Sequence, residues 1–230
     1  MKSIKLNLFG KLYQDTIYNL PQFKIGETNN SIPLYKLGGV YNIPRSMMDI
    51  STSILTEGVK KAVIINDSCK SVRTSIVYDE PNAVLCPIDF LKSDWVHVAY
   101  IDDIFAPDRF LEYSNLSLDF CTENPRDKFI PLINNSQIIF DSRERQHLYS
   151  HIKSPTPIIF HDPHGCECIV NGESIYKTSI YPAIGLKVNG AGDIFAGLFL
   201  DMLLKSGLEY AVNNACFKTT EILLKLNEEV

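Results

Sequence analysis

Short apolar segments alternate with helix-like segments along most of the 230-residue chain, and this alternation restricts the possible folds more than any other feature. Strands are predicted at 4–9, 62–65, 74–78, 95–101, 116–120, 137–140 and 157–160, and helices at 41–55 and 142–152. Beyond residue 190, the apolar residues Ile194, Leu198 and Met202 recur with helical spacing, and a second helix is predicted around 211–226. Buried strands that alternate with helices favour an α/β sandwich with a mostly parallel central sheet.

The segment between residues 166 and 177 is typical of a β-hairpin. Asn171-Gly172 separates the strand-like segments 166–170 and 174–177, and both residue types tolerate the positive φ that a two-residue turn requires. The sequence has no internal repeat, low-complexity segment or linker, so residues 1–230 are interpreted as one domain.

The composition excludes several classes of protein. With 45% hydrophobic and 21% charged residues, the chain can bury a large core, which argues against a disordered protein. A net charge of −5 gives no basic excess for a nucleic-acid partner, and the apolar runs are far shorter than a membrane span. The six cysteines lack the spacing of a disulfide framework. We therefore expect a soluble cytoplasmic protein with reduced thiols and with no nucleic-acid or membrane partner.

The segment most informative about chemistry is Gly190-Ala191-Gly192-Asp193, which precedes an apolar helix. Glycines let the backbone turn tightly and expose successive N–H groups, and the helix points the positive end of its dipole at the same place. Such a helix start binds anions. A carboxylate there suits a general base that works beside a phosphoryl group. The alternative is a glycine-rich loop in which Asp193 only caps the helix.

With Asn189 before it and Phe195 after it, this segment resembles the second signature of the ribokinase-like (PfkB) carbohydrate and nucleoside kinases. Further motifs resemble that family and occur in its order. They are Gly10 and Asp15 after the first strand, Gly38-Gly39 with Asn42 before the first helix, Asp141-x-x-Glu144 after a strand, and His164-Gly165 before the hairpin. Because the motifs keep the family's order over most of the chain, together they are stronger evidence of the resemblance than any single motif is.

The resemblance implies an ATP-dependent kinase that uses Mg²⁺ and phosphorylates a hydroxyl of a small sugar or nucleoside. It implies Asp193 as the base and the amides of Gly190, Ala191 and Gly192 as the anion site. The other implied residues bind the acceptor (Asp15, Gly38, Gly39 and Asn42), the nucleotide (His164, Gly165, Lys187 and Asn214) or the metal (Asp141 and Glu144). It also implies a three-layer fold with a small β lid, formed by about 11–36 and 72–86, through which family members often form homodimers.

Departures from the family pattern support a second hypothesis, a degenerate relative that binds a nucleotide or sugar and regulates without turnover. Lys187 stands where the family usually has an acidic residue, Asp141 replaces an Asn, and Leu37 replaces a Gly. A Gly-x-Gly-x-Asp unit expected between residues 48 and 75 is missing from the sequence. The intact segment 189–193 favours the enzyme.

Simpler structural roles also remain open for three of these residues. Asp15 then lies in a loop without a ligand, Asn42 caps a helix, and Glu144 is a solvated residue of a first helical turn.

A second cluster, His161, His164, Cys166 and Cys168, contains residue types that bind zinc. However, Cys166 and Cys168 are two positions apart on a predicted strand, so both point to one face, and the spacing is not that of a zinc knuckle. We interpret the cluster as a strand end, a turn and a hairpin.

Overall fold

The computed structural model describes residues 5–47, 50–69, 72–78, 87–91, 94–182 and 189–228. The strands are β1 (Lys5–Leu20), β2 (Leu34–Gly39), β3 (Ser51–Asp67), β4 (Val72–Tyr78), β5 (Trp95–Val98), β6 (Leu116–Asp119), β7 (Ile138–Ser142), β8 (Ile158–Asp162), β9 (Gly165–Val170) and β10 (Glu173–Ser179). The α-helices are α1 (Ile130–Asn135), α2 (Ala191–Ser206) and α3 (Leu208–Glu228). The 3₁₀ helices are η1 (Val40–Ser46), η2 (Ile101–Asp103), η3 (Pro107–Glu112), η4 (Asp127–Phe129) and η5 (Arg143–Tyr149).

All of these strands belong to one sheet, whose order is β10-β9-β8-β7-β6-β5-β1-β3-β4, with β2 paired to β1. The run from β8 to β3 is parallel throughout. Antiparallel pairs lie at the margins, where β9 and β10 form the predicted hairpin and β4 pairs with β3. The predicted mostly parallel α/β sheet is confirmed.

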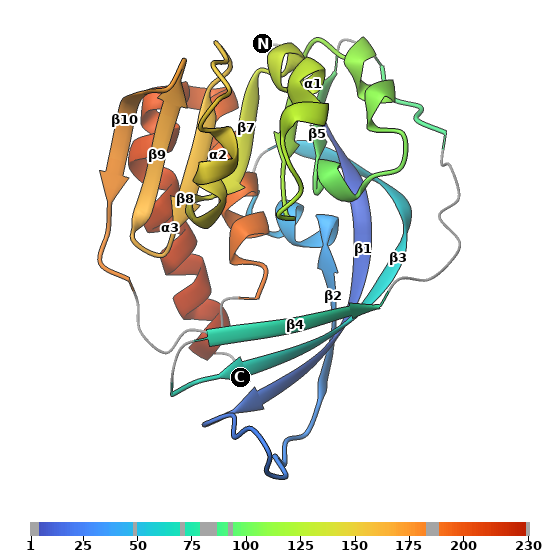
Figure 1. Cartoon of the computed structure of the whole chain (residues 1–230), viewed down its shortest axis with the longest axis vertical. Coiled ribbons are helices and arrows are strands. Elements are labelled where there is room, and N and C mark those ends of the chain that lie inside the picture. Colours follow the sequence, from blue (N-terminus) through green and yellow to red (C-terminus); the bar gives the residue numbers. More distant parts are fainter. Residues whose placement is uncertain are drawn as a thin grey trace.

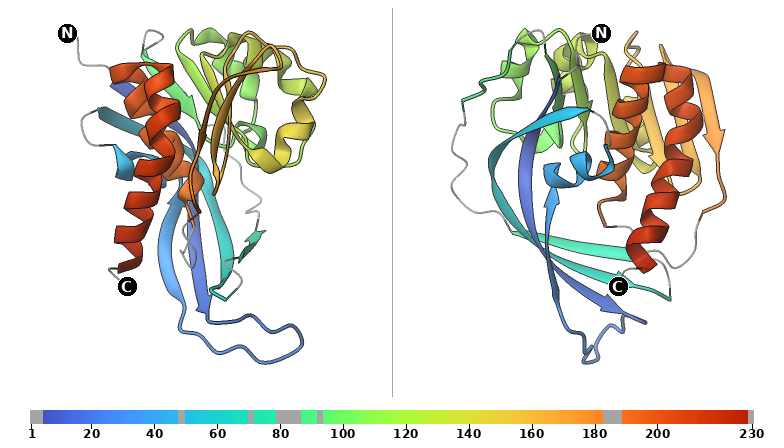
Figure 2. Two further views of the ribbon diagram at one scale, coloured as in Figure 1. Left: turned by 90° about the vertical axis from the view of Figure 1, so that its left-hand side faces the viewer. Right: turned by 180° about the vertical axis from the view of Figure 1, so that it is seen from behind.

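Helices cover both faces of this sheet and give three layers. Figure 2 (left) shows α3 on one side and α1 with most of the 3₁₀ helices on the other. Successive side chains of each strand point to opposite faces of the sheet, so each strand contributes to the hydrophobic core on both faces. In β7, Phe140 packs with α2 residues such as Phe199, whereas its neighbour Ile139 packs on the opposite face with Leu132 of α1.

The outer parts of four strands form a smaller sheet, here called the β extension: residues 12–20 of β1, β2, residues 59–67 of β3, and β4. Figure 1 shows it projecting below the α/β body. A register shift between Gly10 and Leu12 marks where β1 leaves the body. An ion pair between Lys60 Nζ and Asp103 Oδ2 at 2.7 Å ties the β extension to the body.

The β extension differs from the predicted lid segments. The predicted first strand, 4–9, ends too early because β1 continues to Leu20, so Gly10 and Asp15 lie inside a strand and not after it. The outer part of β3, which the sequence did not assign to a lid, supplies a fourth strand. Of the segment 72–86, residues 72–78 form β4 and residues 79–86 lie outside the described residues.

Two predicted helices are wrong in type or length. In place of a helix over 41–55, η1 is followed by β3 from Ser51, because Ser, Thr and Ile over 51–54 suit a pleated strand beside β1. In place of 142–152, only the 3₁₀ helix η5 forms between β7 and β8.

The hairpin and the last two helices are confirmed. Asn171 and Gly172 adopt the expected positive φ values of 53° and 86°. The predicted helices after residue 190 are α2 and α3. Cys166 and Cys168 point to the same side and are fully buried in the core under α2 and α3. Within the described part of the chain, no helix has the length and apolar character needed to cross a membrane.

Candidate active site

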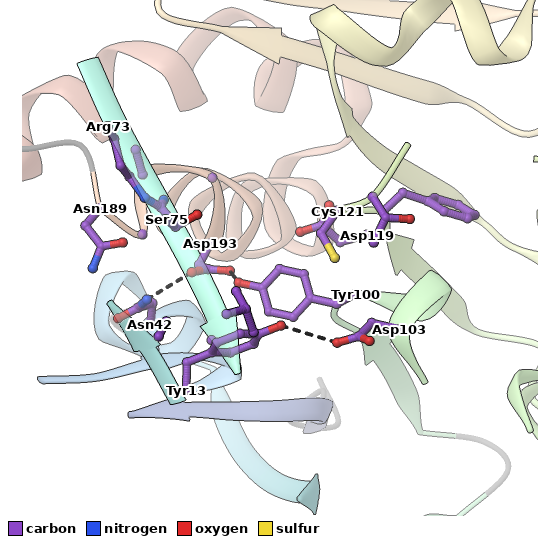
Figure 3. Close-up of a pocket in the computed structure, with 18 of the residues that line it drawn as sticks. Tyr13, Asn42, Arg73, Ser75, Tyr100, Asp103, Asp119, Cys121, Asn189 and Asp193 are labelled. Carbon is purple, nitrogen blue, oxygen red and sulfur yellow. Dashed lines mark hydrogen bonds between the residues drawn. The ribbon is translucent and has the colours of Figure 1, made fainter. Parts of the chain in front are cut away.

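A cavity of about 650 Å³ lies between the α/β body and the inner face of the β extension. Its body wall is formed by residues that follow the carboxyl ends of β5 to β8 and by the start of α2, which is where ligands bind in open parallel sheets. Its other wall comes from the β extension. The residues that line it include Asp15, Gly39, Glu144, Arg145, His161, Gly190, Ala191 and Gly192. They also include Tyr13, Asn42, Arg73, Tyr100, Asp119, Asn189 and Asp193, which are labelled in Figure 3.

The start of α2 faces this cavity. Gly190 caps the helix with a φ of 79°, and no side chain caps it. The first N–H groups of a helix have no partner within it, so the amides of Ala191 and Gly192 are available to an anion beside the positive end of the helix dipole. A Cβ at position 190 would lie 2.6 Å from Asn42 Nδ2, so both backbone angle and space require glycine there.

Asp193 is held from two sides in the first turn of α2. Asn42 Nδ2 donates to Asp193 Oδ2 at 2.9 Å, and the Tyr100 hydroxyl donates to Asp193 Oδ1. Figure 3 shows both side chains approaching the carboxylate. Burial raises the pKa of Asp193 from 3.8 to about 6, and the bonds from Tyr100 and Asn42 oppose that rise. At neutral pH the carboxylate is therefore mostly ionised and more basic than an ordinary Asp.

Asp15 lies on the β-extension side of the cavity. It is 6% exposed and accepts a hydrogen bond from Asn189 Nδ2 at 3.1 Å. Burial raises its pKa, while the Asn189 bond and the positive charge of Arg73 lower it. A Cβ at Gly38 would lie 2.6 Å from Asp15 Oδ2, so this glycine allows β2 to approach the carboxylate. The structure thus brings together Asp15, Gly38, Gly39 and Asn42, the residues for which an acceptor-binding role is expected from the sequence.

Glu144 and Arg145 line the body wall just after β7. Arg145 is positioned by Asp141, whose Oδ1 lies 2.6 Å from Arg145 Nε. The other oxygen of Asp141 accepts bonds from Arg126 Nη2 and the Tyr149 hydroxyl, each at 2.8 Å. Asp141 is fully buried and does not line the cavity. Its predicted role as a metal-linked residue is therefore not supported, because its oxygens already accept bonds from cationic and hydroxyl groups.

The predicted nucleotide residues are not gathered in the cavity. His164 is exposed in the β8–β9 turn, and Gly165 packs closely against Thr178 O, where a Cβ would clash. Asn214 donates to Tyr210 O of its own helix at 2.8 Å. None of these three lines the cavity, and Lys187 lies outside the described residues. Instead His161, considered in the sequence only for zinc, lines it; burial lowers the pKa of His161 to about 4, which keeps its ring neutral.

Several cavity residues were missed from the sequence. Tyr100 adopts a left-handed φ of 61° directly after β5, and Asp119 ends β6. Arg73 reaches the site from β4, at the far edge of the sheet. Asp119 had one usable signal, since it is a carboxylate at the end of a buried strand. Tyr100 and Arg73 had none, because their positions depend on tertiary contacts.

Asp119 is also unusual in its charge environment. Burial raises the pKa of Asp119 well above its usual range, and the negative charges of Asp193 and Asp141 raise it further, whereas Arg145 lowers it. Asp119 thus keeps its proton to a higher pH than an ordinary Asp does, whereas Asp193, with a pKa of about 6, is mostly ionised at neutral pH.

Sequence comparison finds no relative, since no protein-family model and no curated protein matches the chain. Comparison with solved structures finds many matches. A nucleoside kinase from Methanocaldococcus jannaschii, described as an archaeal member of the ribokinase family, has a TM-score of 0.69 at 15% identity, over 96% of this chain and 98% of its own. A ribokinase from Cryptococcus neoformans in complex with ADP has a TM-score of 0.63 at 13% identity, over the whole of both chains.

A third similar structure is a sulfate complex of a pyrophosphate-dependent kinase in the ribokinase family. Its TM-score is 0.66 at 14% identity, over 95% of each chain. The three agree in covering nearly the full length of both chains, so the likeness extends over the whole fold. The chain therefore has the ribokinase-like fold of the PfkB carbohydrate and nucleoside kinases.

Proposed function

We propose that the chain is a phosphotransferase that transfers a phosphoryl group from ATP to a hydroxyl of a small sugar or nucleoside. The observation that carries this proposal is the position of Asp193, a buried carboxylate oriented by Asn42 and Tyr100 beside the unpaired amides that begin α2. A base and an anion site adjoin there, within a cavity large enough for a small molecule. The ribokinase-like fold supports the same reaction.

The proposed reaction needs few groups from the protein. Asp193 accepts the proton of the acceptor hydroxyl while the oxygen of that hydroxyl forms a bond to the γ-phosphorus of ATP. The bond from that phosphorus to the bridging oxygen breaks, and its electron pair leaves with ADP. The amides of Ala191 and Gly192 donate to the phosphoryl oxygens, and Arg145 adds positive charge from the body wall. Asp15 accepts hydrogen bonds from other hydroxyls of the acceptor and so orients it.

The donor set of the cavity suits Mg²⁺. This ion prefers oxygen ligands, keeps several waters and is commonly held by one or two carboxylates together with phosphates. Glu144 and Asp119 both line the cavity, and Glu144 is the residue proposed to hold the ion, through water. Within the described residues, no group of three or more Asp, Glu, His or Cys side chains could hold a metal ion. Bound Mg²⁺ neutralises negative charge on the donor phosphates.

The test is phosphoryl transfer by the wild-type chain and by Asp193→Asn. ATP and pyrophosphate are supplied as donors, because the similar structures include an ADP complex and a pyrophosphate-dependent kinase. Acceptors are pentoses, hexoses and nucleosides, and the product is detected by phosphorus NMR. We expect wild-type turnover and a loss of about 10²- to 10⁴-fold in Asp193→Asn, since that is the usual contribution of a general base. Asp108→Asn, at an exposed position of η3, is the matched control.

Two outcomes contradict the proposal. If Asp193→Asn turns over an acceptor at the wild-type rate, Asp193 is not the base. If the wild type binds ATP, seen as a rise in unfolding temperature, but phosphorylates no acceptor, the chain is the non-catalytic binding relative instead.

We also propose that two copies pair through the outer face of the β extension. The register places Tyr35, Thr16, Val63 and Ile76 in one row across four strands, on the face away from the cavity. Tyr35 is 76% exposed and Ile76 52% exposed. An exposed apolar sheet face of this kind is typical of a protein–protein interface.

A further inference from the structure

His161 lies near the carboxyl end of β8 and lines the cavity together with Gly192. It pairs with Ser142 of β7 on one side and with Cys166 of β9 on the other, so the sheet fixes its backbone from both sides. Because side chains alternate along a strand, its neighbour Phe160 packs in the core on the α1 face, and His161 points to the face that α2 covers. The fold therefore brings an imidazole ring to the start of α2.

The ring of His161 is held against the first turns of this helix. Its centroid lies 4.6 Å from that of the Phe195 ring, with an angle of 33° between the two planes. Phe195 therefore covers one face of the imidazole and restricts its rotation. A Cβ at Gly192 would lie 3.4 Å from His161 Cε1, the carbon that is bonded to both ring nitrogens. The edge of the ring that carries the nitrogens is thus beside Gly192, whose amide belongs to the proposed anion site.

This edge of the ring is open to the cavity. In the part of the chain that the structure describes, neither ring nitrogen of His161 has a hydrogen-bond partner. The Nε2 atom of His97 is also unpaired, but it is enclosed in the core, whereas the nitrogens of His161 are not enclosed. Polar atoms inside proteins are normally paired with protein or water. An unpaired imidazole edge in a cavity therefore indicates the place of a ligand.

The ring of His161 is neutral at physiological pH. Burial, together with the positive charges of Arg145 and Arg143, lowers the pKa of His161 to about 4, and the negative charge of Asp162 opposes them. A neutral imidazole carries one N–H donor and one acceptor lone pair. It can therefore donate to an oxyanion without bringing a further positive charge beside the two arginines.

His161 and the expected acceptor residues reach the start of α2 from different sides. Tyr100, which donates to Asp193, follows β5, whereas His161 lies in β8, and two strands separate β5 from β8 in the sheet. Asn42, which also donates to Asp193, comes from η1. An acceptor hydroxyl held near Asp193 therefore leaves the His161 side of the anion site to the phosphate donor.

We propose that His161 is a catalytic residue that donates a hydrogen bond from its ring N–H to the phosphoryl group being transferred, next to the amides of Ala191 and Gly192. This inference rests on the proposed function and adds a donor-side residue to it. A fixed donor at that place stabilises charge on the phosphoryl oxygens without reorganising during the transfer. The competing explanation is that the ring only packs against Phe195, in which case an apolar side chain of similar size serves equally well.

The test is calorimetric binding at pH 7.5 without an acceptor, so that it does not depend on turnover. The probes are ATP and pyrophosphate, each with Mg²⁺, and adenosine, which carries no phosphate. The proteins are the wild type, His161→Leu, which keeps an apolar contact with Phe195, and His161→Gln and His161→Asn, whose amides keep an N–H donor. The matched control is His151→Leu, at an exposed histidine outside the cavity. Thermal unfolding verifies that each variant is folded.

We expect His161→Leu to bind pyrophosphate and ATP about 10- to 100-fold more weakly than the wild type does, the effect of one hydrogen bond to a charged group. At least one of the two amide variants keeps most of the affinity, and His151→Leu keeps all of it. Adenosine binding is the same in every protein.

NMR of the wild type gives a second measurement that does not depend on the folding of a variant. With isotope-labelled histidine, the ring nitrogens of His161, one of five histidines, are observed directly. We expect their chemical shifts to change when pyrophosphate is added and to stay the same when adenosine is added.

The inference is overturned if His161→Leu binds pyrophosphate as tightly as the wild type, if both amide variants bind it as weakly as His161→Leu, or if the ring signals of His161 do not respond to pyrophosphate. An equal weakening of ATP and adenosine binding also overturns it, because the ring then contacts the nucleoside. Wild-type turnover together with pyrophosphate binding that does not depend on His161 removes only this inference. Binding that depends on His161, without turnover of any acceptor by the wild type, supports this inference and removes the kinase.

Discussion

Asp193→Asn is expected to make the protein more stable while it removes activity. Burial raises the pKa of Asp193 from 3.8 to about 6, which means that the folded state disfavours the ionised carboxylate by about two pKa units, or ~3 kcal/mol at 1.36 kcal/mol per unit. An amide at this position carries no charge and avoids that cost. It loses part of the hydrogen bonding from Tyr100 and Asn42, which opposes the gain by about 1 kcal/mol.

The net gain is about 1–2 kcal/mol at pH 7.5, which raises the unfolding temperature of a chain this long by roughly 2–8 °C. The gain depends on pH with a definite sign. Because the folded pKa of Asp193 is raised, the folded wild type binds its proton more tightly than the unfolded chain does. The free energy of unfolding of the wild type therefore falls as pH rises from about 4 to about 6, and it falls no further through this group above about pH 6. The advantage of Asp193→Asn grows over the same interval.

The assay is thermal unfolding of the wild type, Asp193→Asn and Asp108→Asn at pH 4.5, 5.5 and 7.5. Asp108 is exposed, so its substitution changes the same atoms without relieving burial. We expect the unfolding temperature of Asp193→Asn to lie close to the other two at pH 4.5, to exceed them at pH 5.5 and to exceed them by the full amount at pH 7.5. If Asp193→Asn is no more stable than the wild type at pH 7.5, or if the difference between them does not change with pH, the assignment of a buried carboxylate with a raised pKa is refuted.

Three further predictions address other groups of the site. Tyr100→Phe removes a hydrogen bond that lowers the pKa of Asp193, so the acidic limb of the pH profile of kcat/KM should move upward by about one pH unit. An acidic limb that stays in place between pH 5 and 8 contradicts the role of this hydroxyl. Glu144→Gln should raise the Mg²⁺ concentration needed for half-maximal activity severalfold without changing the unfolding temperature, and full wild-type activity in excess EDTA would exclude the metal. Tyr35→Lys with Ile76→Lys should convert a dimer into a monomer in sedimentation, whereas a wild type that is already monomeric at micromolar concentration rules out the interface.

The parts of the fold that the sequence predicted well depend on local chemistry. The Asn171-Gly172 turn needs only residues that accept positive φ, and α2 needs only a glycine cap followed by an apolar face. The buried strands β5 to β8 have short apolar runs that any parallel sheet between helices would require. The position of Asp193 at the start of a helix could be predicted for the same reason, since it depends only on the four consecutive residues 190–193.

The predictions that were wrong or missing concern features that depend on where a segment lies in the folded molecule. β3 passes from the body, where it pairs beside β1, into the β extension, so its burial pattern changes along its length and does not keep one period. Residues 51–55 at its start fitted a helical spacing equally well. Tyr100 and Arg73 join Asp193 through contacts that bridge many positions of the chain, and no local pattern contains them.

The face of the sheet opposite α2 and α3 carries little α-helix, and this affects the layers of the fold more than the site. On the face opposite α2 and α3, the described connections between β5 and β8 are mostly 3₁₀ turns, with the six-residue α1 as the longest α-helix there. The cavity residues come instead from the ends of the strands: Tyr100 after β5, Asp119 at the end of β6, Glu144 after β7 and His161 in β8. In a parallel sheet these ends converge at one edge whatever covers the faces, because strand pairing alone sets their positions. Helices can therefore shorten without moving the carboxylates and cations of the site, provided that β1 and β3 continue past that edge to form the opposite wall.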